Sequence, residues 1–140
     1  EGNESKPELM IDVATLTGAA RTALGTELPA LFSNDDLVAE GILRAAQKER
    51  DPLWRLPLWD GYDKYIDSAI ADITNTPNYG FAGSITAALF LKRFVSPNTP
   101  WVHIDSYAWN NDNQPGRPSG GEALALRALF SYLHTRFPST

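Results

Sequence analysis

The fold is decided by residues 9–18, LMIDVATLTG. The apolar, partly β-branched run at residues 9–14 predicts a strand buried on both faces, as in parallel sheets, and the polar turn at residues 15–18 ends it. A short helix is expected over residues 19–24, where Gly25 stops it, and residues 28–32 predict a second strand. Strand, turn, helix and strand in this order predict an α/β domain.

Local signals then predict three further helices. Asn34 or Asp35 is expected to cap a helix that runs to about residue 48. Apolar residues at three-to-four spacing predict an amphipathic helix over residues 60–71, with its aromatic stripe directed inward. Ser84 is expected to cap the next helix, which runs to about residue 95.

The last part of the chain combines a strand, a long loop and a terminal helix. Residues 101–105 alternate in polarity and predict a strand. Residues 119–122, SGGE, have the S-x-x-E form of a capping box, which predicts a helix from there to about residue 137. Residues 72–80 and 106–118 are rich in turn-forming residues, and their length makes both loops candidate functional sites.

Composition sets limits on the class of protein. The chain has 140 residues, of which 43% are hydrophobic and 21% charged, as expected for one globular domain over residues 1–140. The net charge of −5 and the lack of a basic face argue against nucleic acid as a partner. The absence of cysteine excludes thiolate zinc sites and cysteine nucleophiles. The most apolar stretch, residues 81–91, is shorter than the roughly 20 residues that span a bilayer, so no membrane partner is expected.

The chain begins with Glu1, without a secretory or transit pattern, which we interpret as a cut within a longer chain. Strands that precede residue 9 in such a parent would cover an edge of the sheet. We therefore expect the 140-residue chain on its own to be marginally stable or to self-associate.

The residues alone indicate no complete catalytic constellation. The motifs G-x-S-x-G, H-E-x-x-H, G-x-x-x-x-G-K-[ST] and G-x-G-x-x-G are all absent. The Thr17-Gly18 turn resembles half of a dinucleotide-binding turn, but a plain strand-to-helix turn is the commoner interpretation. His103 and Asp105 lie two apart on a strand, a spacing that suits a metal pair or a His–Asp hydrogen bond. A buried histidine that is satisfied by a carboxylate is commoner than a metal ligand.

Five blocks in this order resemble the leucyl (cytosol) aminopeptidase family. They are residues 12–20 (DVATLTGAA), 54–58 (WRLPL), 71–75 (ADITN), 82–88 (AGSITAA) and 101–105 (WVHID). The resemblance extends from about Leu9 to Leu133 and corresponds to the C-terminal part of the catalytic domain. It implies a three-layer α/β/α structure with a mixed central sheet, a cytoplasmic location and a homohexameric parent.

The resemblance implies a two-metal aminopeptidase that releases N-terminal amino acids such as Leu from peptides. The family binds two divalent ions, Mn or Zn, through Lys, Asp and Glu residues that lie N-terminal to the segment present here. No metal ligand and no catalytic residue is therefore expected in this chain, which would be inactive alone. The alternative is a non-catalytic α/β module, derived from the same fold, for assembly or binding.

The resemblance assigns a substrate cradle to this chain. Its residues are Thr15, Leu16, Thr17, Gly18, Thr76 and Ala108. Backbone groups of Leu16 and Gly18 are expected to bond the peptide unit of the substrate. Ala108 matches a wall of the pocket for the N-terminal side chain, and Thr76 matches the pocket on the leaving side. Main-chain contacts of this kind place the scissile carbonyl while tolerating varied side chains.

Overall fold

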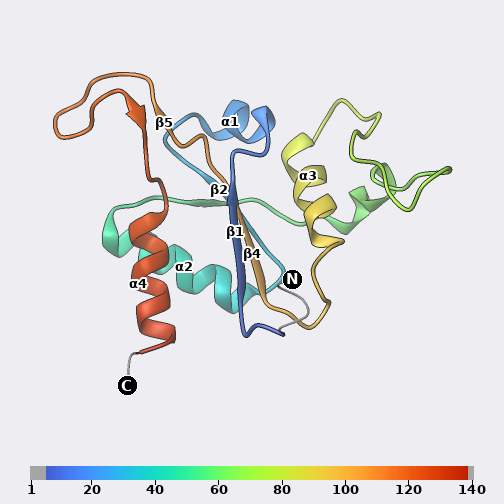
Figure 1. Cartoon of the computed structure of the whole chain (residues 1–140), viewed down its shortest axis with the longest axis horizontal. Coiled ribbons are helices and arrows are strands. Elements are labelled where there is room, and N and C mark those ends of the chain that lie inside the picture. Colours follow the sequence, from blue (N-terminus) through green and yellow to red (C-terminus); the bar gives the residue numbers. More distant parts are fainter. Residues whose placement is uncertain (1–5, 139–140) are drawn as a thin grey trace.

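The structure is a computed structural model that describes residues 6–138. Its elements follow one another as strands and helices in alternation over most of the chain (Figure 1). They are β1 (Met10–Ala14), α1 (Gly18–Leu24), β2 (Ala30–Ser33), α2 (Asp36–Glu49), β3 (Trp54–Arg55), the 3-10 helix η1 (Asp60–Tyr65), α3 (Gly83–Lys92), β4 (Trp101–Asp105), β5 (Trp109–Asn110), β6 (Gly120–Gly121) and α4 (Leu126–Arg136).

The central sheet is mixed, as the resemblance implied. Its strand order is β1-β4-β2-β3, with β1 parallel to β4, β4 antiparallel to β2, and β2 parallel to β3. In the β1–β4 register Asp12 faces His103 and Ala14 faces Asp105. Because these two strands are parallel, their carboxyl ends meet at one edge, and the segments that follow both strands lie together there.

Helices cover both faces of the sheet, which confirms the three-layer α/β/α arrangement (Figure 1). On one face α2 and α4 pack over Leu31, Val102 and Ile104, all with 0% exposure. On the other face α1 and α3 pack over Ala30 and Phe32. Within residues 6–138, no helix combines the length and the apolar character that a bilayer crossing requires.

Several predicted elements form where their local signals lie. Gly25 ends α1 with a positive φ of 83°, a conformation that glycine adopts without strain. Asp35 caps α2 by accepting a hydrogen bond from the backbone N–H of Val38 at 3.0 Å. β4 occupies residues 101–105 as predicted.

The prediction that β1 is buried on both faces is wrong. Among the described residues β1 pairs only with β4 and forms the edge of the sheet. Val13 is consequently 53% exposed. An apolar run indicates that a strand can be buried, but the neighbours that bury it come from tertiary structure.

Two helices are shorter than their patterns predicted. Instead of a helix over residues 60–71, η1 ends at Tyr65, and Ile70 is 99% exposed because the chain has left the packed surface. A backbone bond from Thr74 N to Ile66 O closes this loop. α3 begins at Gly83 after Ala82 in a left-handed conformation, so Ser84 lies inside the helix and does not cap it.

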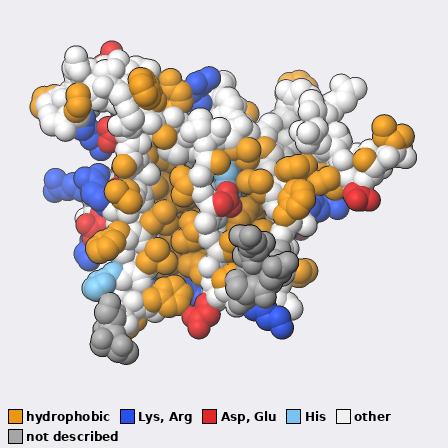
Figure 2. Space-filling view, viewed as in Figure 1, with side chains coloured by type: hydrophobic (Ala, Val, Ile, Leu, Met, Phe, Trp, Pro, Cys, Tyr) orange, Lys and Arg blue, Asp and Glu red, His pale blue; other side chains and the backbone are white. Residues whose placement is uncertain are grey.

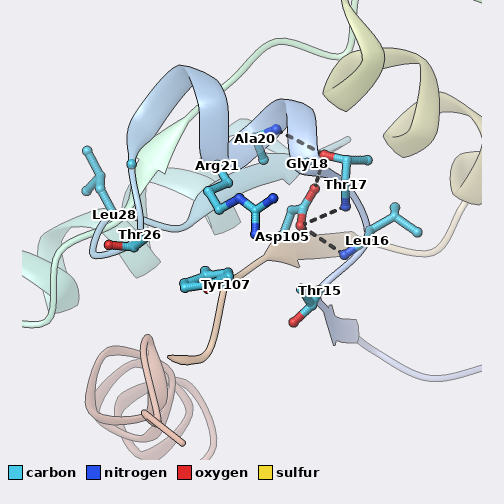
Figure 3. Close-up of a pocket in the computed structure, with 11 residues that line it drawn as sticks. Thr15, Leu16, Thr17, Gly18, Ala20, Arg21, Thr26, Leu28, Asp105 and Tyr107 are labelled. Atoms are coloured by element: carbon cyan, nitrogen blue, oxygen red, sulfur yellow. Dashed lines mark hydrogen bonds between the residues drawn. The ribbon is translucent and has the colours of Figure 1, made fainter. Parts of the chain in front are cut away.

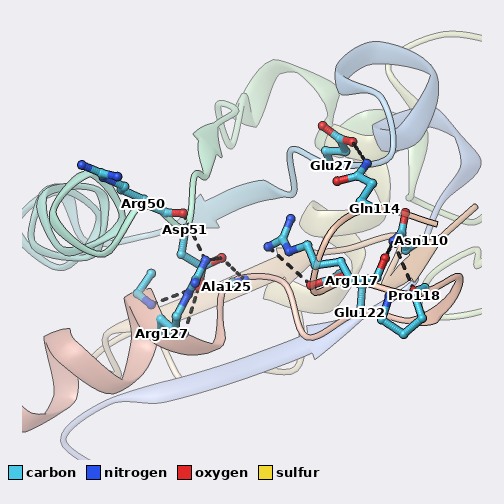
Figure 4. Close-up of polar contacts among 11 residues, drawn as sticks. Glu27, Arg50, Asp51, Asn110, Gln114, Arg117, Pro118, Glu122, Ala125 and Arg127 are labelled. Carbon is cyan, nitrogen blue, oxygen red and sulfur yellow. Dashed lines mark hydrogen bonds and ion pairs between the residues drawn. The ribbon is translucent and has the colours of Figure 1, made fainter. Parts of the chain in front are cut away.

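The terminal helix does not start at the predicted capping box. Gly120–Gly121 pairs with β5 as strand β6, and α4 begins only at Leu126. Its amino end is capped by Asp51, a residue that is 2% exposed and follows α2 (Figure 4). Asp51 accepts hydrogen bonds from the backbone N–H groups of Ala125 at 3.0 Å, Arg127 at 2.9 Å and Ala128 at 3.2 Å. A carboxylate distant in sequence therefore replaces the local cap.

Candidate functional site

The turn between β1 and α1 is shaped by one buried carboxylate. Asp105, at the end of β4, is 4% exposed. Its Oδ1 accepts hydrogen bonds from the backbone N–H groups of Leu16 at 3.0 Å and Thr17 at 3.3 Å. Its Oδ2 accepts a third from the Thr17 hydroxyl at 2.7 Å (Figure 3). Hydrogen bonds to a charged acceptor are stronger than neutral ones, so Asp105 holds the turn in one conformation.

Further hydrogen bonds hold the turn at both ends. Thr17 Oγ1 accepts from the backbone N–H of Ala20 at 3.0 Å, which makes Thr17 the N-cap of α1. Thr15 donates its hydroxyl to the Ser106 carbonyl at 2.6 Å, and Ser106 N donates to the Ala14 carbonyl at 2.9 Å. The backbone of residues 15–18 is therefore preorganised.

Two cavities flank this turn, and Leu16 and Thr17 line both. The first cavity has a volume of about 240 Å³, and the second about 370 Å³. The first is lined by Thr15, Leu16, Thr17, Gly18, Ala20, Arg21, Gly25, Thr26, Leu28, Asp105 and Tyr107. The second is lined by Leu16, Thr17, Asn75, Thr76, Pro77, Tyr79, Gly83, Thr86, Ala87 and Phe90.

The structure brings most of the predicted site residues together. Thr15 and Gly18 line the first cavity, and Thr76 lines the second, across the turn. Ala108 lines neither cavity; its neighbour Tyr107 forms the wall of the first one. Ala108 instead has a positive φ of 54°, and its carbonyl accepts from Glu122 N at 3.0 Å.

A tyrosine cluster stands beside the second cavity. The rings of Tyr65 and Tyr79 are stacked, with centroids 3.7 Å apart, and Tyr62 lies 5.9 Å from Tyr79. A hydrogen bond with the Tyr65 side chain raises the pKa of Tyr79 above the usual value for a phenol, and partial burial and the neighbouring tyrosines raise it further. The ring in this cavity wall is therefore neutral at physiological pH.

His103 has a different partner from the predicted one. Its Nδ1 lies 2.5 Å from Asp12 Oδ1, while Asp105 bonds only to the turn. Trp101 donates Nε1–H to Asp12 Oδ2 at 2.7 Å, and the fully buried His103 ring stacks against Phe32 at 5.9 Å. This arrangement ties β1 to β4 beneath the turn and supports the interpretation of His103 as a core histidine.

The described residues do not form a metal centre. No group of three or more His, Asp or Glu side chains within residues 6–138 has an arrangement that could hold an ion. Two metal ions therefore do not fit the residues described. A phosphate at the Thr17-Gly18 turn is also disfavoured, because the Asp105 carboxylate already occupies the N–H groups of Leu16 and Thr17 and would repel an anion.

Sequence reasoning missed three residues of this site. It considered Asp105 only as a partner of His103, and it did not single out Arg21 or Tyr107. The available signal was a polar residue at the carboxyl end of a strand, where α/β sheets bind ligands. Arg21 carried no such signal, because a charged residue on a short helix is usually a solvated one.

The three-layer fold and the preorganised turn between two cavities define an α/β domain with a candidate ligand site at the carboxyl ends of parallel strands. A sequence profile described as the cytosol aminopeptidase family, catalytic domain, matches residues 1–130. The chain belongs to the cytosol aminopeptidase family, which confirms the resemblance found in its sequence.

Individual relatives agree with this assignment. The probable cytosol aminopeptidase of Syntrophotalea carbinolica is 49% identical over 130 residues, which cover 91% of this chain and 26% of that protein. The crystal structure of the cytosol aminopeptidase from Coxiella burnetii has a TM-score of 0.91 and 54% identity, over 96% of this chain and 29% of that one. The bottromycin maturation enzyme BotP in complex with Mn has a TM-score of 0.86 and 39% identity, over 92% and 29%. The chain thus spans about a quarter of the length of the curated relatives it matches.

Proposed function

We propose that this chain forms the substrate cradle of a two-metal aminopeptidase that releases N-terminal amino acids such as Leu from peptides. The family membership and the Mn-bound relative support a metal-dependent peptidase. Because residues 6–138 do not fit a metal pair, the proposal assigns the ligands for two Mn or Zn ions to other residues of the whole protein. It includes a homohexameric, cytoplasmic whole protein, as the family resemblance implies.

One observation carries the proposal: Asp105 fixes the backbone of residues 15–18 between two cavities. Asp105 occupies the Leu16 N–H, so the Leu16 group left for the substrate is its carbonyl, which can accept from a peptide N–H. The backbone N–H of Gly18 can donate to the substrate in return. A peptide bound across the turn would place its N-terminal side chain in the first cavity and the next residue in the second.

The alternative function is a non-catalytic assembly or binding module. Figure 2 shows apolar side chains gathered between α4 and β1. Exposed Val13 and Phe130 (53% and 71% exposed) belong to these two elements. An apolar face of this kind marks an interaction surface, either with the rest of an enzyme or with a partner. Enzymatic activity distinguishes the two.

The test is hydrolysis of leucyl-p-nitroanilide with added Mn²⁺ or Zn²⁺ and an EDTA control. We expect chelator-sensitive hydrolysis by the longest protein that the gene for residues 1–140 encodes, and none by the 140-residue chain alone. Chelator-sensitive hydrolysis by the chain alone would show that its own residues bind the metals. Activity in neither protein would favour the assembly module.

A chimera isolates the contribution of the cradle. Residues 6–138 would replace the matching segment of the Coxiella burnetii aminopeptidase, whose fold agrees with a TM-score of 0.91. We expect the chimera to hydrolyse the leucyl substrate at a rate within about 100-fold of its host, since small displacements in a site cost up to that factor. A folded chimera without activity would contradict the assignment of the cradle.

A further inference from the structure

The first cavity is lined by a positively charged side chain, Arg21, that the proposed function does not use. Arg21 projects from α1 toward Tyr107 and the turn (Figure 3). Its guanidinium carbon lies 4.9 Å from the centroid of the Tyr107 ring. Its Nη2 lies 3.8 Å from the point where a Cβ on Gly18 would be. The charge is therefore held over the same backbone that the proposal assigns to the substrate.

The guanidinium has no carboxylate partner in the part of the chain that the structure describes. No Asp or Glu oxygen within residues 6–138 forms an ion pair with Arg21. Among the residues that the structure describes, Asp105 is the only acidic one that lines this cavity, and its two oxygens already accept three hydrogen bonds from the turn. The N–H donors of Arg21 are thus available for a ligand carboxylate, which a guanidinium can bind through two parallel hydrogen bonds.

We propose that Arg21 makes the first cavity a subsite for the side-chain carboxylate of an N-terminal acidic residue such as Glu. This inference rests on the proposed function, because it takes the substrate to lie along residues 15–18. A volume of about 240 Å³ suits a single side chain.

Stacking of Arg21 on Tyr107 is the competing explanation. A guanidinium over an aromatic ring is a common surface contact and needs no ligand. Stacking alone predicts that the choice between an acidic and a neutral substrate does not depend on Arg21. A carboxylate subsite predicts that it does, which makes substrate selectivity the decisive measurement.

The experiment uses the longest protein that the gene encodes. It compares the kcat/KM of this protein for glutamyl-, glutaminyl- and leucyl-p-nitroanilide. Glutamine has the shape of glutamate without its charge, so the Glu/Gln ratio isolates the carboxylate. We expect Arg21→Ala to lower this ratio about tenfold, the lower end of the effect of a charge-assisted hydrogen bond because the site is open to solvent. Arg21→Lys keeps the charge but loses the planar fork, and is expected to give an intermediate ratio.

Controls separate this effect from a general loss of positive charge. Arg44, on α2 across the sheet, is an exposed guanidinium that pairs with Glu40. Arg44→Ala is expected to leave the Glu/Gln ratio unchanged. Raising the ionic strength should lower the ratio in the wild-type protein, because salt screens an exposed charge. An unchanged ratio in Arg21→Ala would overturn the proposal.

Two further measurements complete the test. One shows which carboxylate of the substrate Arg21 binds, and the other decides the proposal if the protein has no activity. If Arg21→Ala changes the discrimination between Leu-Leu and Leu-Leu-amide, but not the Glu/Gln ratio, the cation binds a terminal carboxylate and our assignment is wrong. If the wild-type protein hydrolyses none of the substrates, the proposed function fails. In that case NMR of the guanidinium N–H of Arg21 decides the inference: a shift on adding glutamate but not glutamine supports it, and no shift overturns it.

Discussion

Asp105→Ala is expected to lower kcat/KM for leucyl-p-nitroanilide by about 100-fold, the cost of a misplacement of about 1 Å in a reacting complex. The substitution removes the acceptor of the Leu16 N–H, the Thr17 N–H and the Thr17 hydroxyl together. The turn would then lose the conformation that presents the Leu16 carbonyl and the Gly18 N–H. Most of the loss should appear in kcat, because binding through the side-chain cavities remains while the carbonyl is misplaced.

A conservative variant at Asp105 and a control variant at an exposed carboxylate define this effect. Asp105→Asn keeps the size and one acceptor oxygen, and is expected to lose only about tenfold, since a neutral acceptor forms weaker hydrogen bonds. Glu40→Ala removes an exposed carboxylate on α2 and should leave kcat/KM unchanged. The measurement is steady-state kinetics of the longest protein that the gene encodes, together with its melting temperature. If the kcat/KM of the Asp105→Ala variant stays within threefold of the wild-type value, the positioning role of Asp105 is refuted.

Asp51→Ala is expected to destabilise α4 by about 3 kcal/mol, because it leaves buried N–H donors without an acceptor. Ala125 and Ala128, whose N–H groups bond to Asp51, are both 0% exposed, so water cannot readily replace the carboxylate. α4 packs against α2, and its loss would uncover one face of the sheet. The measurement is hydrogen exchange of the α4 amides, which reports the local opening free energy without requiring two-state unfolding.

The matched variants for Asp51 are Asp51→Asn and Asp112→Ala. Asparagine keeps an acceptor oxygen and should cost about half as much as alanine, because the remaining hydrogen bonds are neutral. Asp112 is exposed, and its replacement should change protection by less than about 0.5 kcal/mol. Equal protection of α4 in Asp51→Ala and in the wild type would mean that the helix cap contributes nothing to stability.

Local patterns were sufficient for elements whose signals are close in sequence. Asp35 caps the helix that directly follows it, and Gly25 ends α1 by its own conformational freedom. The alternating pattern at residues 101–105 formed a central strand. The aromatic spacing over residues 60–71 was misleading, because Tyr62 and Tyr65 pack against Tyr79 across a loop and not along a longer helix.

The candidate site, in contrast, depends on contacts between residues that lie far apart in the sequence. The family resemblance identified residues 15–18 as a cradle, but the sequence did not indicate what holds them. Asp105 lies 89 residues from Leu16, and His103 lies 91 residues from its partner Asp12. Pairing at such separations depends on the parallel register of β1 and β4.

The sequence by itself determined the α/β class, the positions of α1, α2 and β4, and the family to which the chain belongs. Tertiary structure alone decided that Asp51 caps α4, that Asp105 shapes the turn, and that Arg21 stands over the first cavity. The physical reason is range. Helix caps, turns and hydrophobic periodicity act over a few residues, whereas a buried carboxylate takes its hydrogen-bond donors from whichever segments the packed sheet brings beside it.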